Sequence, residues 1–254
     1  MGFDIVSGYD ACMETNGNSR LSGNLCSFIK YCEKIDFTQY DGIIFTNCCN
    51  STQRLYDYVK YHYPKLYMFL LEVPRNKNER INYYSMFSSL EKQFNLSENT
   101  ENKEEKTAPV PGIVLHQLKI QRDGILIIAS SLHKEYVGNL TKIFSGYNLK
   151  LESCQSVPRG DFVLNKTMEI SCPRMMGFFK YIRNKIDQVS AVIYIITQRC
   201  DYIMFTYPQI KKICEDRNMK CLVLEEEYVG HISERGKIRY EAFKESLELD
   251  KIRI

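Results

Sequence analysis

The sequence of 254 residues contains no long apolar run. No stretch approaches the roughly 18 apolar residues that a membrane-spanning helix needs. The first residues, MGFDIVSGYDACMETNGN, also have no basic segment followed by an apolar run, which a secretion signal would require. We therefore expect a cytoplasmic protein that has no membrane partner.

The sequence also has almost no excess of one charge over the other. The 34 basic and 31 acidic residues leave a net charge of +3, and Lys and Arg form no block along the chain. A protein that binds the nucleic-acid backbone usually concentrates basic residues on one face. The charge pattern therefore indicates no nucleic-acid partner.

Several motifs of enzyme sites are also missing. The sequence has neither of the glycine-rich phosphate loops, G-x-G-x-x-G and G-x-x-x-x-G-K-[ST], and no G-x-S-x-G nucleophile turn. Its four histidines show no HxxH or HExxH spacing, so we expect them to face solvent and not to bind zinc. If ATP takes part in the function, another protein hydrolyses it.

Cysteine, by contrast, is abundant. In the reducing cytosol, cysteines do not form a disulfide framework, so each one is a core residue, a metal ligand or a nucleophile. A buried core position is the usual role of a free cysteine. The ten cysteines stand at positions 12, 26, 32, 48, 49, 154, 172, 200, 214 and 221.

Strand-like and helix-like segments alternate in both halves of the chain. The first half predicts strands at 41–46 and 66–74 and helices at 50–64 and 80–96. The second predicts strands at 124–131, 191–197 and 220–228 and helices at 133–147, 175–186, 207–218 and 239–248, with a loop from 148 onward through VPRGDF. This alternation is typical of α/β proteins with parallel sheets. We expect two domains, residues 1–96 and 113–254, joined by a polar linker at 97–112.

The two halves share a local plan. In each, a β-branched strand is followed by a cysteine and then by a helix, as in GIIFTNCCNSTQRLYDYV and VIYIITQRCDYIMFTYPQIKKI. In open α/β sheets, ligands bind beyond the carboxyl ends of the strands, where helix N-termini also point. Cys49 and Cys200 are therefore candidate functional residues.

Five segments occur in the order seen in one family: LCSFIKYCEK (25–34), DGIIFTNCCNSTQRLYD (41–57), SCPRMMGFFKYI (171–182), VIYIITQRCDYIMFTYPQIKK (192–212) and RYEAF (239–243). The chain resembles a shortened member of the 2-hydroxyacyl-CoA dehydratase / benzoyl-CoA reductase subunit family. The resemblance implies two Rossmann-like or flavodoxin-like domains with a [4Fe–4S] cluster in the cleft between them. Its three cysteine ligands correspond to Cys26, Cys49 and Cys200 here.

The neighbours of these cysteines add detail to the resemblance. Cys49 is preferred to Cys48 because it directly precedes Asn50 and Ser51, which match the family's Cys-Asp-Ser. Asn50 replaces an Asp, which removes one negative charge beside the cluster. Arg54, together with Arg174 in the third segment, is a candidate for contacts around the cluster. No catalytic residue is identified.

The function implied by the resemblance is a lyase subunit. Such enzymes eliminate water from a 2-hydroxyacyl-CoA through a ketyl radical, or reduce an aromatic acyl-CoA. The electron comes from a separate ATP-dependent activator, and a related subunit usually completes the enzyme. Two alternatives stay open: a stand-alone iron–sulfur protein that transfers electrons and does not bind CoA, and an α/β binding protein that has lost its cluster.

Overall fold

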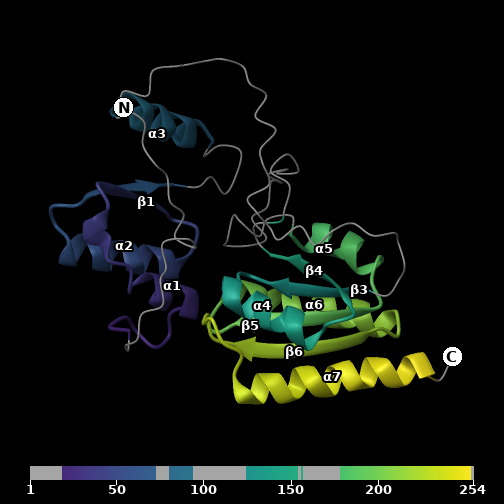
Figure 1. Cartoon of the computed structure of the whole chain (residues 1–254). Helices are drawn as coiled ribbons and strands as arrows, with labels where there is room; N and C mark the ends of the chain where they lie inside the picture. Colours follow the sequence, from purple (N-terminus) through teal and green to yellow (C-terminus); the bar gives the residue numbers. More distant parts are fainter. Residues whose placement is uncertain (1–18, 73–79, 94–123, 154–155, 157–177, 253–254) are drawn as a thin grey trace.

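The computed structural model describes residues 19–72, 80–93, 124–153, 156 and 178–252. They form two parallel sheets with their own helices (Figure 1), which confirms the predicted α/β class. The predicted linker at 97–112 and the segment around Cys172 lie outside the described residues. The domain boundary therefore stays a prediction.

The smaller sheet consists of β1 (Gly42–Thr46) and β2 (Tyr67–Leu71), which pair in parallel. Between them runs α2 (Asn50–His62), whose buried side chains Thr52, Leu55 and Val59 recur at helical spacing. They pack in a small core that also holds residues of α1 (Ser27–Cys32) and of the 3-10 helix Phe37–Gln39. Helix α3 (Arg80–Gln93) follows β2.

The larger sheet has the strand order β4-β3-β5-β6, and all its strand pairs are parallel. Its strands are β3 (Gly124–Ala129), β4 (Asn148–Glu152), β5 (Ala191–Thr197) and β6 (Lys220–Glu226). Every residue of β3 and β5 is buried, because helices cover both faces of the sheet. The core on one face includes α5 (Phe178–Ile186) and α6 (Asp201–Asp216), and the core on the other includes α4 (Lys134–Ile143) and α7 (Glu234–Ile252).

Several elements differ from the sequence-based prediction, among them α7, which spans Glu234–Ile252 instead of 239–248, and the unpredicted 3-10 helix Phe37–Gln39. Residues 148–152, expected in a loop, form β4, and α1 was not predicted. Helix α6 begins at Asp201 instead of 207 and contains Pro208. Helix α4 ends at Ile143, four residues before the predicted end, and Gly146 then adopts φ +94°, a left-handed conformation that ends helices.

Among the described residues, no helix is both long enough and apolar enough to cross a lipid bilayer. The longest of the helices above, α7, carries charged residues throughout its length.

Candidate functional site

The crevice of the larger sheet lies where β3 and β5 end. Chain connections leave this adjacent pair in opposite directions, to β4 on one side and to β6 on the other. Ligands of α/β sheets bind at such a switch point. The two strand ends are tied together there, because the Ser130 hydroxyl donates to Thr197 Oγ1 at 2.6 Å and Thr197 Oγ1 donates to the Ser131 carbonyl at 3.3 Å.

Cys200 stands at this crevice. A tight turn follows β5, closed by the Cys200 N–H, which donates to the Thr197 carbonyl at 2.9 Å. Arg199 in this turn has φ +61°, a left-handed conformation that costs a non-glycine residue about 1–2 kcal/mol. Cys200 is then the N-cap of α6. Strained backbone of this kind is often found at functional sites.

Cys49 holds the corresponding place in the smaller unit. It is the N-cap of α2, and its Sγ accepts a hydrogen bond from the Thr52 N–H at 3.5 Å. The preceding Cys48 is only 2% exposed and belongs to the core. A hydrogen bond with Cys48, together with burial, raises the pKa of the Cys49 thiol, so this side chain is neutral in the metal-free protein.

Cys26 connects the two units. It is the N-cap of α1, and its backbone N–H donates to Ser51 Oγ, two residues after Cys49, at 3.4 Å. The next residue, Ser27, donates its N–H to the carbonyl of Gln198, two residues before Cys200, at 3.0 Å. The backbone around Cys26 therefore lies beside both of the other cysteine loops.

The three cysteines thus share one structural role, since each is the N-cap of a helix. Thiolates at such positions are suitable ligands for iron. However, no three His, Cys, Asp or Glu side chains in the described part of the chain are grouped so that they could hold a metal ion. The donor type and the backbone placement fit a cluster, whereas the thiols as they are placed do not yet form a ligand set.

The other candidate residues have different surroundings. Ser51 contacts Cys26, as described, whereas the Asn50 side chain is exposed. The side chain of Arg54 is 69% exposed and pairs with Asp57 at 3.2 Å. Arg174 lies outside the described residues.

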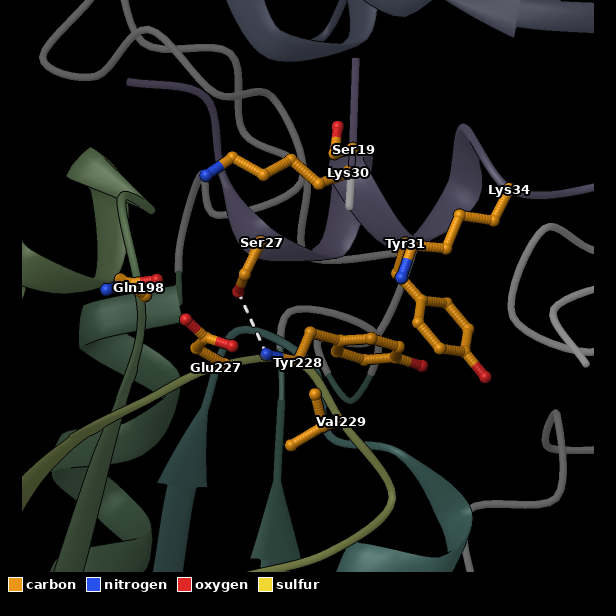
Figure 2. A pocket seen from close by; sticks show the side chains of 9 residues that line it. All are labelled: Ser19, Ser27, Lys30, Tyr31, Lys34, Gln198, Glu227, Tyr228 and Val229. Atoms are coloured by element: carbon orange, nitrogen blue, oxygen red, sulfur yellow. Dashed lines mark hydrogen bonds between the residues drawn. The ribbon is translucent and has the colours of Figure 1, made fainter. Parts of the chain in front are cut away.

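A pocket of about 180 Å³ opens between α1 and the loops after β5 and β6 (Figure 2). Its size suits a small polar group and not a whole CoA molecule. One of its lysines, Lys30, donates from Nζ to the Gly23 carbonyl at 3.0 Å. Sequence reasoning missed this pocket because it did not predict α1. The lining residues are Ser19, Ser27, Lys30, Tyr31, Lys34, Gln198, Glu227, Tyr228 and Val229.

The expectation that all histidines face solvent is wrong for one of them. His133 accepts the Glu135 N–H at Nδ1, and its Nε2 lies 3.1 Å from the hydroxyl of Tyr31. The bond to Tyr31 joins residues 102 positions apart, and no local sequence signal indicates it. His62 and His231 are exposed, as predicted.

One comparison with known proteins gives a match. The family model "2-hydroxyglutaryl-CoA dehydratase, D-component" matches residues 162–247, roughly a third of the chain. The matched part includes β5, α6 and β6, with Cys200, but neither Cys26 nor Cys49. Among curated proteins, none matches the chain significantly.

Proposed function

From membership in the 2-hydroxyacyl-CoA dehydratase family, which this match supports, we propose that the chain is an iron–sulfur subunit of a dehydratase of that kind. Cys26, Cys49 and Cys200 would hold a [4Fe–4S] cluster. When bound, such a cluster would supply a single low-potential electron and one iron without a protein ligand. The observation that carries the proposal is the position of all three cysteines at helix N-termini, with the backbone N–H groups of Cys26 and Ser27 hydrogen-bonded to Ser51 near Cys49 and to Gln198 near Cys200.

Helix N-termini favour this role on electrostatic grounds. The first N–H groups of a helix have no partner within the helix, and the helix dipole adds partial positive charge at that end. A cluster held by three thiolates is anionic, so positive partial charge beside each ligand favours its binding. Helices α2 and α6 supply most of this effect, since α1 is only six residues long.

Binding of iron requires the cysteines to lose their protons. Because the pKa of the Cys49 thiol is raised, its proton competes with iron for the sulfur, so iron uptake should become stronger as the pH rises. Thr52 supports the thiolate form of Cys49, because both its N–H and its hydroxyl lie within hydrogen-bond distance of the sulfur. Cys48 remains in the core.

The proposed substrate is an acyl-CoA, and the proposed partners are a related dehydratase-type subunit and an ATP-dependent activator. The pocket between α1 and the loops after β5 and β6 would take the polar end of the acyl group, where Ser27 and Tyr31 offer hydroxyls. The rest of the CoA thioester would lie outside the pocket, on this chain or on the second subunit. Binding of an acyl-CoA to the iron-loaded chain would exclude the alternative that the chain is a stand-alone electron carrier.

The experiment is iron and acid-labile sulfide analysis of protein purified without oxygen. Wild type is compared with Cys26→Ser, Cys49→Ser and Cys200→Ser, and with Cys221→Ser as the matched control. Cys221 is also partly buried, but it lies near the start of β6, at the opposite edge of the sheet from Cys200.

We expect about four irons per chain in wild type and in the control, as a cluster of this type contains. Each of the three other variants should lose most of this iron. Iron content that is indifferent to these three changes, or protein that binds no iron after reconstitution, would refute the proposed site.

A further inference from the structure

Helix α1 is held against the larger sheet by two hydrogen bonds of one residue. The Ser27 N–H donates to the Gln198 carbonyl at 3.0 Å, and Ser27 Oγ accepts the N–H of Tyr228 at 2.9 Å. Figure 2 shows the second bond as Ser27 reaches down from α1 to the loop after β6. Ser27 is 8% exposed, so these bonds are largely shielded from water. Ser27 thus joins α1 to the loop after β5 through its backbone N–H and to the loop after β6 through its side chain.

An aromatic cluster surrounds this joint. The ring of Tyr228 makes edge contacts with Phe28 at 4.9 Å and Tyr31 at 5.2 Å, both from α1. His133, at the start of α4, packs edge-on against Tyr31 at 5.6 Å. Because its Nδ1 accepts the Glu135 N–H, its Nε2–H donates to the Tyr31 hydroxyl. Ring pairs in this geometry add to the stability of a contact beyond the buried area. We call Ser27, Phe28, Tyr31, His133 and Tyr228 the α1 seam.

Helix α1 depends on tertiary contacts, which it makes in the seam and in the core of the smaller unit, where Ile29 and Cys32 are buried. It has six residues, and a helix of this length does not persist in water without tertiary packing. Cys26 directly precedes it and is its N-cap, so the position of Cys26 follows the position of α1. The loop that α1 contacts through Gln198 is the loop that carries Cys200.

We propose that the α1 seam positions Cys26 opposite Cys200, and that its opening separates the two cysteines while both sheets stay folded. Ser27, Tyr31 and His133 are then positioning residues, which act through the placement of α1. This inference rests on the proposed function for its purpose, namely assembly of a three-cysteine site between the two units. It concerns a movement of the chain itself, which can be measured without iron.

The first test is hydrogen exchange of the full chain, prepared without iron. Ser27→Ala removes the acceptor for Tyr228, and Tyr31→Phe removes the bond to His133 while it keeps the ring. Loss of a buried hydrogen bond shifts an open–closed equilibrium by about tenfold. We therefore expect amides of residues 27–32 to exchange about tenfold faster in each variant, whereas those of β5 keep their wild-type rate.

Matched controls exist for both changes. Ser89→Ala and Tyr61→Phe alter exposed residues of α3 and α2, and neither should change exchange in α1. Unchanged exchange of α1 in the seam variants would overturn the proposal. An equal increase in the exchange rate of the β5 amides would also overturn the proposal, because α1 would then open only when the larger sheet unfolds with it.

The second test measures the distance that the seam controls. A short reagent that joins two thiols should link Cys26 to Cys200 in wild type, and the yield should fall in Ser27→Ala. Ser89→Ala, an exposed change in α3, is the control variant, and its yield should match that of wild type. A wild-type protein in which Cys26 and Cys200 are not linked, or a yield that Ser27→Ala leaves unchanged, would contradict the proposal.

Measurements of iron binding distinguish the proposed function from the proposed role of the α1 seam. After reconstitution, the seam variants should lose iron to a chelator about tenfold faster than wild type, in line with the shift in opening. If wild type binds no iron while the exchange and cross-linking results hold, the proposed function fails and the seam stands. If iron binds but exchange and cross-linking do not respond, the seam fails alone.

Discussion

The hydroxyl pair of Tyr136 and Tyr240 gives a sharp test of how the larger unit is held together. Tyr136 lies in α4 and Tyr240 in α7, and their hydroxyl oxygens are 2.9 Å apart. Both side chains are at most 1% exposed. Burial is the main cause that raises the pKa of both tyrosines, so both stay neutral and one hydroxyl donates to the other.

Replacement of one tyrosine by phenylalanine removes this bond but leaves the other hydroxyl buried. A buried polar group that loses its partner costs about 1–3 kcal/mol of unfolding free energy, whereas removal of both partners is nearly neutral. We therefore expect Tyr136→Phe and Tyr240→Phe each to lower stability by about 2 kcal/mol. The double variant should be no less stable than either single one.

The assay is urea unfolding of the full chain, followed by circular dichroism. Tyr61→Phe is the matched control, because Tyr61 is 81% exposed and its hydroxyl should contribute almost nothing. The four proteins of the cycle give the coupling energy directly. A double variant whose loss equals the sum of the two single losses would show that the hydroxyls do not support each other.

Two further changes test charged groups. Burial raises the pKa of the Glu226 carboxyl above its usual 4.5, so this carboxyl binds a proton more tightly in the folded protein than in the unfolded chain. The stability of the protein should therefore fall as the pH rises through the folded-state pKa. In urea unfolding at several pH values, the unfolding free energy of Glu226→Gln should therefore depend less on pH above 4.5 than that of wild type, and the variant should be more stable than wild type at pH 7. The same pH dependence in both proteins would contradict this. Arg54→Ala should change stability by less than about 0.5 kcal/mol, because the exposed pair with Asp57 is screened by water, and iron analysis should show the wild-type content.

The sequence predicted most of the fold because buried strands and amphipathic helices leave a strong periodic signal. Strand β5 is a run of seven buried residues, and the prediction matches its bounds. The predicted start of α6 at 207 is wrong, because the helix already begins at Asp201 and contains Pro208, a residue that is uncommon in a helix interior. Strand β4, with the sequence NLKLE, alternates polar and apolar residues over only five positions at the edge of the sheet, which is too short for a firm prediction.

The candidate site was predictable to the extent that α/β topology determines it. Cys49 and Cys200 each follow a recognisable strand and precede a helix, so their position at a carboxyl edge could be inferred from pattern alone. Cys26 precedes a helix but follows no strand, so only resemblance to a family indicated it. Its structural role depends on Ser27, Tyr31 and Tyr228, which join residues about 200 positions apart.

That difference has a consequence for how the site is assembled. Cys200 is fixed by the buried strand β5, and Cys49 by the packing of α2 on the smaller sheet, so each keeps its place within its own unit. Cys26 packs with α1 against the core of the smaller unit, and the backbone N–H of Ser27 joins it to the Cys200 loop through the Gln198 carbonyl. The proposed three-cysteine site would therefore form or open as the two units dock through α1, and the distance from Cys26 to Cys200 should depend most on the contacts between the two units.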